Sequence, residues 1–453
     1  MISNSRNINN MINNHYKGSL DTMTSINTTP THVYYDVIVT NRSTTSQPPV
    51  RLVYDEKKNT PFLTCPQDYY FSIVRFSLDT PSLPVFIPIM DLTNSGNLNP
   101  TPSIPQPTIY SITLTYTDAT TNTTYAGEQV YVNWIPQDQD ATPPKNTSTN
   151  PELGIAGIQD TNTTYYYCYS FQWFIELCNK AFGEAFDSLN TVVINAGLAL
   201  PTQNPPFMTW SISQGLAIIN ADVGTSAGGF LATNLNNIPI TIGTTDFTTY
   251  SSISIFMNNA LYNIFNSFPM IQYSYGDVVL INGTQVNGGN IQIPITTYAG
   301  QNTIQQPINA FNAGSGGTTY TCAQVSQEFS TIAIMSPVDS IVFTTATIPV
   351  KPGNVALPYI YDGNTVLSLS NNANIISIMT DFQSSSGEYR SFLQYTPTVY
   401  RLIDLMGNQT LSNVDLSVYW KGRDGLLRPL YLATGGTASI KMMFRLRSFS
   451  SDK

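Results

Sequence analysis

The stretch DLSVYWKGRDGLLRPLYLATGGTASIKMMFRLRSF, from Asp415 to Phe449, predicts two β-strands joined by a loop. Its second half alternates apolar and mostly basic side chains, namely Ile440, Met442, Phe444 and Leu446 with Lys441, Met443, Arg445 and Arg447. Since successive side chains of a strand point to opposite faces, one face of this strand belongs to a core and the other points outward. The outward face is therefore basic.

This basic strand contrasts with the rest of the chain, which is acidic. Residues 390–453 contain nine basic and four acidic residues, whereas residues 1–389 contain ten basic and twenty-four acidic ones. Between Phe76 and Val350 the basic residues are Lys145 and Lys180 alone. A body that is acidic over nearly three hundred residues is not expected to bind nucleic acid along its length.

Two hypotheses account for the basic residues Lys441, Arg445 and Arg447. They form a solvated edge strand, where Lys and Arg discourage unwanted strand pairing, or they contact an acidic partner or a phosphate group.

The surface composition is also unusual, because only 10% of the 453 residues are charged and Asn, Thr, Ser, Gln and Tyr replace the missing charge. A typical soluble domain has about 25% charged residues. Protein interfaces are depleted in Lys, Glu and Asp and enriched in Tyr, so this composition suits a surface covered by neighbouring subunits. An AT-rich genome, which favours Asn and Tyr codons, is an alternative and compatible explanation.

Strand signals dominate the chain after a polar N-terminal segment that shows no periodicity. Runs rich in β-branched and aromatic residues predict strands at 33–40, 50–56, 68–78, 110–117, 130–137, 331–350, 374–382 and 400–407, and a hairpin at 276–295. In 110–117 the apolar and hydroxyl side chains alternate strictly, which predicts a strand buried on one face. Many short strands with Pro and Gly turns predict an all-β fold, an antiparallel jelly-roll sandwich with one or two jelly rolls.

Two segments show helical spacing instead. In residues 170–193 a stripe of apolar side chains comprises Phe171, Phe174, Ile175, Cys178, Phe182, Phe186 and Leu189. Residues 257–268 repeat the pattern and Pro269 ends it. We expect both to be helices inserted among the strands, with their apolar stripes in the core.

The expected domain organisation has three parts. Residues 1–31 form a flexible N-terminal arm, because they are rich in Asn and lack periodicity. Residues 32–270 form a first β body with helical insertions, and residues 271–453 form a second β body or the strands that complete the first.

The sharpest enzyme-like motif is GTSAGG at 224–229, which fits the G-x-S-x-G nucleophile elbow with Ser226 as the nucleophile. The histidines of the chain, His15 and His32, both precede it, whereas an α/β-hydrolase requires a histidine after the serine. A dyad of Ser226 with Asp362 lacks a Gly-rich oxyanion segment. We therefore predict a loop here, and a protein that is not an enzyme.

No metal or cofactor site is predicted. The glycine loop AGSGG at 313–317 is not followed by the lysine of a phosphate-binding loop. Asp138 and Asp140 lack the spacing of a calcium loop, and two histidines without clustered cysteines do not make a zinc site.

The cysteines and hydropathy indicate the compartment. Residues 1–19 lack the apolar segment of a secretory signal, and no apolar run approaches eighteen residues, so neither secretion nor a membrane span is expected. Cys65, Cys168, Cys178 and Cys322 are accordingly expected to be reduced core residues.

Several predicted strand segments resemble sequences in capsid proteins of polinton-like viruses and virophages. They are QEFSTIAIMSPVDSIVFTTATIPV (327–350), YTPTVYRLIDLMGNQTLSNVDLSVYWKGRDGLLRPLYLATGGTASIKMMF (395–444) and, less closely, DYYFSIVRFSLDTPSLPVFIP (68–88). Together they cover about a quarter of the chain and include no catalytic signature.

This resemblance implies a self-assembling jelly-roll subunit of an icosahedral DNA virus capsid, of the minor capsid or penton type. A major capsid protein with a double jelly roll is the alternative. The implied partners are further copies of the chain, as a pentamer or trimer, other capsid proteins and, through Lys441, Arg445 and Arg447, acidic neighbours or the packaged genome. The implied location is the virion, after synthesis in the host cytoplasm or nucleus.

A β-rich attachment protein that binds glycans is the hypothesis from another class of function. Sugar recognition would use exposed aromatic side chains, and Trp134, Trp173, Trp210 and Trp420 are the tryptophans available.

Overall fold

The computed structural model describes most of the chain between residues 30 and 450. Side chains and backbone are described for 30–43, 50–79, 83–93, 98–101, 104–139, 141–146, 157, 159–222, 228–230, 252–271, 291–295, 324–350 and 392–448, and the backbone path also for 241–242, 245–246, 251, 272, 280–281, 284–285, 302–305, 319–323, 359–362, 365–368, 378–383 and 449–450. The predicted arm lies outside the described residues except for Pro30 and Thr31.

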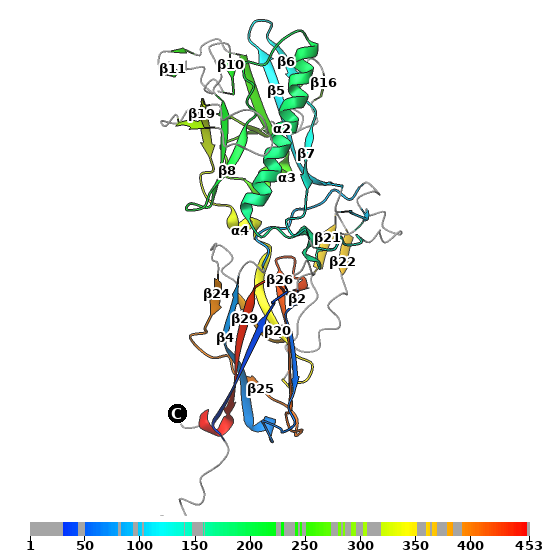
Figure 1. The fold of residues 1–453 in the computed structure, drawn as a ribbon, viewed down its shortest axis with the longest axis vertical. Helices are drawn as coiled ribbons and strands as arrows, with labels where there is room; N and C mark the ends of the chain where they lie inside the picture. The colour runs from blue at the N-terminus through cyan, green and yellow to red at the C-terminus, as the bar shows by residue number, and fades with distance from the viewer. Residues whose placement is uncertain are drawn as a thin grey trace, which may run out of the picture.

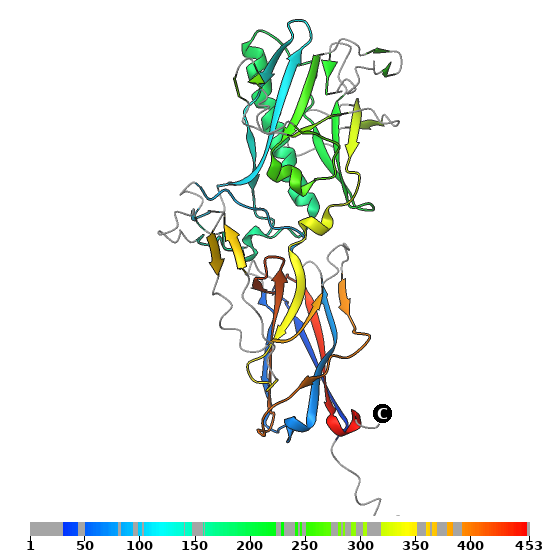
Figure 2. The ribbon, with the colours of Figure 1, turned by 180° about the vertical axis from the view of Figure 1, so that it is seen from behind.

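The molecule consists of two bodies stacked along its long axis (Figures 1 and 2). The lower body, in the orientation of Figure 1, contains both the first and the last strands of the chain. The upper body is made of the middle of the chain, which leaves the lower body after β4 and returns to it at β20.

One sheet of the lower body brings together strands from the two ends of the chain. Its order is β1–β29–β4–β24, with β25 also paired to β4. All its pairs are antiparallel. The bounds are β1 His32–Thr40, β29 Thr437–Leu446, β4 Tyr69–Asp79, β24 Phe392–Tyr395 and β25 Ile403–Asp404.

The second sheet has the order β23–β20–β26–β27, with β3 paired to the other end of β26. The short pair of β2 with β28 forms a separate two-stranded sheet. The bounds are β23 Ile378–Gln383, β20 Val338–Thr344, β26 Asn413–Gly422, β27 Leu427–Pro429, β3 Val53–Lys57, β2 Val50–Arg51 and β28 Tyr431–Leu432.

The strand order of these sheets identifies the lower body as a jelly roll. The eight main strands, numbered in chain order, are β1, β3, β4, β20, β23, β24/β25, β26 and β29. In this numbering one sheet has the order one–eight–three–six and the other has the order five–four–seven–two. This arrangement of two interlocked Greek keys is the double-sheet jelly roll. The predicted all-β jelly-roll fold is confirmed, and within the described residues the chain contains one such roll.

The upper body, which we call the inserted body, packs two sheets around a long helix. One sheet has the order β14–β17–β13–β5–β6, with β10 paired to β13 and β7 paired to β5; the other has the order β18–β19–β9–β8. The bounds are β5 Gln106–Asp118, β6 Thr123–Ala126, β7 Val130–Trp134, β8 Phe207–Ser211, β9 Leu216–Asp222, β10 Gly228–Gly229, β13 Ser251–Met257, β14 Ile271–Gln272, β17 Ile291–Ile293, β18 Asn302–Gln305 and β19 Thr319–Ser326.

Short elements complete the structure. Three two-stranded hairpins are β11 Thr241–Ile242 with β12 Thr245–Asp246, β15 Leu280–Ile281 with β16 Thr284–Gln285, and β21 Tyr359–Asp362 with β22 Thr365–Ser368. The second of these lies within the hairpin predicted at 276–295. The 3-10 helices are η1 Pro66–Asp68, η4 Thr164–Tyr166 and η6 Arg447–Ser450.

Of the two predicted helices, one is confirmed and the other is shorter than expected. α2 spans Phe171–Asn195, and its whole predicted apolar stripe is buried. α3 spans only Asn259–Ile264, because Met257 still pairs in β13 and the Asn258 side chain caps the helix by accepting a bond from the Leu261 N–H at 3.0 Å. A third helix, α4 Ile332–Met335, replaces the start of the strand predicted at 331–350.

The strand predicted to be buried on one face is buried on both. In β5 the hydroxyl-bearing residues Ser111, Thr113 and Thr115 are as buried as their apolar neighbours. The Ser111 hydroxyl accepts a hydrogen bond from the Gln129 side chain at 2.8 Å. Because hydroxyl groups can satisfy their hydrogen bonds inside a protein, their alternation with apolar residues did not indicate solvent.

The two bodies have separate hydrophobic cores. The jelly-roll core combines residues up to Leu83, together with Tyr167, with residues from Val338 onward, whereas the other core residues between Phe86 and Met335 belong to the inserted body. The boundary predicted at residue 270 does not separate these cores, since Phe268 and Ile291 both belong to the inserted body.

Candidate assembly face

The predicted basic residues lie on the strand β29 and just after it, in the middle of a sheet. β29 pairs with β1 on one side and with β4 on the other. The hypothesis that these residues protect an open sheet edge is therefore wrong. Lys441 and Arg445 point outward from β29, and Arg447 begins the 3-10 helix η6.

Lys441 shares the carboxylate of Asp36 with Arg75. Asp36 on β1 and Arg75 on β4 are the partners of Lys441 on either side in the sheet register. The Lys441 ammonium lies 3.3 Å from Asp36 and the Arg75 guanidinium lies 3.6 Å from it. The Lys441 Nζ also lies 5.2 Å from the centre of the Tyr34 ring. Two cations thus share one anion here.

Arg447 has a similar environment at the other end of the strand. Its guanidinium pairs with Asp404 of β25 at 2.8 Å and donates to the Leu405 carbonyl at 3.3 Å. It lies 4.7 Å from the centre of the Tyr70 ring. Arg445 stands opposite Tyr70 on one neighbouring strand and opposite His32 on the other.

We call the outward side of this sheet, with Asp36, Arg75, Asp404, Lys441, Arg445 and Arg447, the charged face. Four cations and two anions give it an excess of positive charge. Met443, which the alternation also placed outward, is only 1% exposed. Met443 therefore does not contribute to the exposed surface of this face. Asp36, Arg75 and Asp404 were missed from the sequence, because only the strand register brings them to β29.

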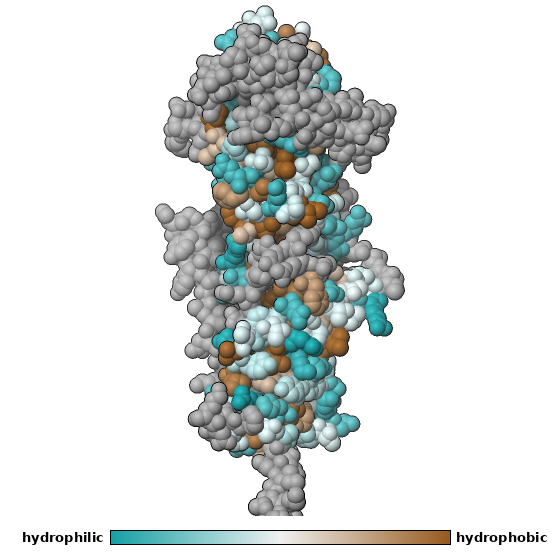
Figure 3. Space-filling model, turned by 90° about the vertical axis from the view of Figure 1, so that its left-hand side faces the viewer, coloured by the Kyte–Doolittle hydropathy of each residue, from teal (hydrophilic) through white to brown (hydrophobic). Residues whose placement is uncertain are grey.

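Apolar side chains are exposed at the base of the inserted body. Ile212 in the β8–β9 turn is 65% exposed, Phe329 57% and Ile334 on α4 50%. The turn packs on the start of α4, since a Cβ at Gly215 would lie 2.5 Å from the Ile332 Cδ1. Figure 3, which views this side of the molecule, shows apolar side chains gathered at that height. We call Ile212, Phe329 and Ile334 the apolar patch.

The described part of the chain contains no group of side chains arranged for catalysis or for metal binding. Ser226, His15, Asp140 and the 313–317 loop lie outside it, and of Asp362 only the backbone is described. In the ranges given above, no group of three or more His, Cys, Asp or Glu side chains is placed to hold a metal ion. Over the same ranges no helix is both long and apolar enough to cross a membrane.

The cysteines and tryptophans are mostly core residues. Cys168 and Cys178 are buried free thiols, as predicted, and burial raises the pKa of both. Cys65 is free but exposed, contrary to the prediction, because it precedes η1 at the end of the jelly roll; the side chain of Cys322 lies outside the described residues. Trp134 and Trp420 are fully buried, and Trp173 and Trp210 are partly buried against the core, so none supports a glycan site.

Comparisons with known proteins agree with the jelly-roll geometry. The model of a family described as Sputnik minor capsid protein V18/19 matches residues 33–446. A protein of the Sputnik virophage described as uncharacterized protein V18 is 27% identical over 164 residues, which cover 36% of this chain and 87% of that protein.

Solved structures are similar over nearly the whole chain. A chain in the cryo-EM structure of the Sputnik virophage has a TM-score of 0.65 at 21% identity, with 93% of this chain and 100% of that chain covered. The mavirus penton protein has a TM-score of 0.49 at 12% identity, with 92% and 99% covered.

Proposed function

Since the chain belongs to the Sputnik minor capsid protein V18/19 family, and is thus a structural protein of the virion capsid and not an enzyme, we propose that it forms the pentameric vertex of the capsid. The observation that carries this proposal is the single jelly roll found in the described residues.

The number of jelly rolls per chain distinguishes the two assemblies expected from the sequence. Three chains with two rolls each make a six-sided unit, as in the major capsid alternative. Five chains with one roll each make a five-sided unit that fits a fivefold vertex. Between residues 85 and 335, the length that a second roll would need, the described core residues other than Tyr167 instead form the inserted body.

The surface supports lateral contacts between subunits. Large side chains such as Phe329 are rarely exposed in groups on monomeric proteins unless they bind a partner. The low content of charged residues also suits a subunit covered by its neighbours. On this proposal the chain is synthesised in the host cytoplasm or nucleus. Its two hydrophobic cores correspond to two domains.

The mass of the purified protein tests this proposal. Light scattering of the 49.9 kDa chain is expected to give about 250 kDa, since a closed ring of five copies is the smallest unit with fivefold symmetry. A trimer of about 150 kDa would contradict it. A stable monomer that binds glycans would favour an attachment protein.

The charged face is a proposed contact with acidic surfaces of neighbouring capsid subunits. Its positive excess is complementary to the rest of the chain, because residues 1–389 carry ten basic and twenty-four acidic residues. The packaged genome is the other anionic partner expected from the sequence. We favour the protein partner because neighbouring copies of the chain, whose residues 1–389 are acidic, supply such a surface next to the face.

Replacing Lys441, Arg445 and Arg447 together with Gln is expected to reduce the yield of assembled particles. The fold should be retained, because each exposed ion pair contributes only about 0–1 kcal/mol. The measurement is particle yield by sedimentation, with genome content per particle measured alongside.

A matched control replaces three exposed basic residues elsewhere, Arg42, Lys57 and Arg423, with Gln. Normal yield with reduced genome content would assign the face to the genome. Normal yield and normal content would remove any contact role.

A further inference from the structure

Residues 160–169, which we call the tongue, belong to the inserted body by sequence but contact both bodies. The tongue adds to the link between them, since Cys168 forms an antiparallel bridge with Phe86, with N–H to carbonyl distances of 2.9 and 3.3 Å. Phe86 follows directly on the segment through which the chain leaves the jelly roll. The tongue is thus a third connection at the junction, beside the two covalent ones.

Consecutive side chains of the tongue enter different cores. Tyr165, Tyr166 and Cys168 are buried in the inserted body. Tyr167 is buried in the jelly-roll core, where its ring packs at 5.8 Å and 69° against Trp420. Its hydroxyl donates back to the Thr161 carbonyl at 3.0 Å.

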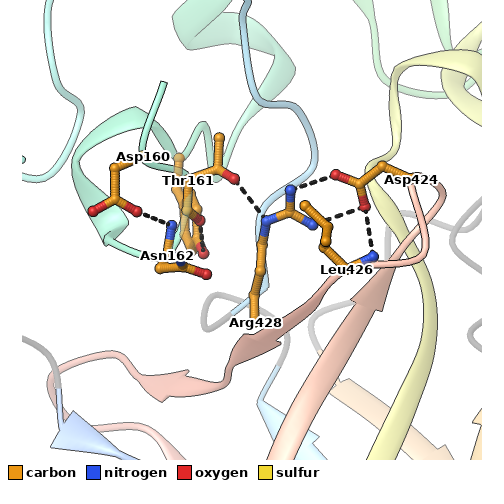
Figure 4. Close-up of polar contacts among 7 residues, drawn as sticks. Asp160, Thr161, Asn162, Asp424, Leu426 and Arg428 are labelled. Carbon is orange, nitrogen blue, oxygen red and sulfur yellow. Dashed lines mark hydrogen bonds and ion pairs between the residues drawn. The ribbon is translucent and has the colours of Figure 1, made fainter. Parts of the chain in front are cut away.

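Arg428 connects the tongue to the β26–β27 hairpin of the jelly roll (Figure 4). Its Nε donates to the Thr161 hydroxyl at 2.8 Å, across the junction. Its Nη1 and Nη2 donate to the two carboxylate oxygens of Asp424 at 3.0 and 2.5 Å. Its guanidinium also lies 5.0 Å from the centre of the Trp420 ring.

Arg428 is only 5% exposed, so these bonds are formed largely out of water. Burying a guanidinium costs free energy unless its N–H groups are hydrogen-bonded. Because the guanidinium is planar, its two bonds to the carboxylate oxygens of Asp424 also fix the direction of the remaining Nε–H group. The hairpin leaves space for it at Gly422, where a Cβ would lie 2.5 Å from the Arg428 Nη1. The direction of the Nε–H toward the tongue is therefore set by the jelly roll.

We infer that Arg428 is a positioning residue: by holding Thr161 it fixes the orientation of the inserted body on the jelly roll. This inference needs only the junction geometry. Its consequence for the capsid, that each copy enters the pentamer with its inserted body at one preset angle, rests on the proposed function.

The test compares Arg428→Met with Arg423→Met, an exposed arginine of the same hairpin, in the full chain and in the same oligomeric state. Small-angle scattering of Arg428→Met is expected to show a broader distribution of distances, because the inserted body takes up several orientations. Calorimetry is expected to resolve the unfolding of the two bodies into two transitions about 5 °C apart or more. Arg423→Met should match the wild type in both.

A purely stabilising role predicts something else, a single transition at lower temperature with unchanged scattering, and that result would overturn the inference. If Arg428→Met does not fold, Thr161→Val removes only the Arg428 bond across the junction and leaves intact both the Asp424 pair and the bond from the Tyr431 hydroxyl to the Asn162 carbonyl at 3.3 Å. It should broaden the distances to a smaller extent; unchanged scattering of Thr161→Val would also overturn the inference. These readouts do not depend on whether the assembly is a pentamer, which the mass measurement decides separately.

Discussion

Replacing Tyr167 with alanine is expected to destabilise the jelly roll by about 3–5 kcal/mol, the usual cost of truncating a buried aromatic side chain. Tyr167 is 1% exposed and its ring packs against Trp420 in the jelly-roll core. The loss should appear as a lower midpoint of urea unfolding followed by tryptophan fluorescence.

Two variants separate the contributions of the ring and the hydroxyl group. Tyr167→Phe keeps the ring and loses the hydroxyl with its bond to the Thr161 carbonyl, so about 0.5–1.5 kcal/mol is expected. Tyr400→Ala, at an exposed position, should change stability by less than about 0.5 kcal/mol. If Tyr167→Ala behaved like Tyr400→Ala, the tongue would not be part of the jelly-roll core.

Local patterns in the sequence predicted local structure well. The helical stripe from Phe171 to Leu189 and the alternation from Ile440 to Leu446 both correspond to observed core faces. The period of a pattern depends only on the geometry of one helix or strand, which neighbouring residues determine.

Partners far apart in the chain could not be predicted in this way. The alternation in β29 does not indicate that β1 and β4, more than 350 residues earlier, lie on its two sides. The insertion between β4 and β20 was missed for the same reason, since it leaves each strand pattern intact. The charged face was consequently predicted with its β29 and η6 cations but without Asp36, Arg75 and Asp404.

The second large effect is expected at Asp415, which connects β26 to the turn that follows β20. Its carboxylate accepts four hydrogen bonds, from the hydroxyls of Thr345 and Thr347 at 2.5 Å each and from the N–H groups of Ala346 and Thr347 at 2.6 and 2.8 Å. Asp415→Ala would remove these four charge-assisted bonds, leaving the buried Thr345 hydroxyl without this acceptor and the exposed Ala346 and Thr347 donors to water. We expect a loss of about 3 kcal/mol in the free energy of unfolding at pH 7.

The pH dependence distinguishes this role from simple packing. Burial alone would raise the pKa of Asp415, but the hydrogen bonds from Thr345, Thr347 and the backbone outweigh it, and the pKa lies below its ordinary value of 3.8. A carboxyl with a lowered pKa in the folded state stabilises the protein fully above its unfolded-state pKa, and this stabilisation is lost as pH falls through the folded value.

The difference in stability between the wild type and Asp415→Ala should therefore stay constant from pH 7 to about pH 5 and shrink below about pH 4. Urea unfolding of both proteins across this range measures it, with Asp339→Ala, at an exposed position on β20, as the control. A difference that persists undiminished at pH 3 would mean that the shape of the side chain, and not its charge, holds the turn. In that case Asp415→Asn, which keeps the shape and one acceptor oxygen, should restore the stability fully, whereas the charged role predicts only a partial recovery.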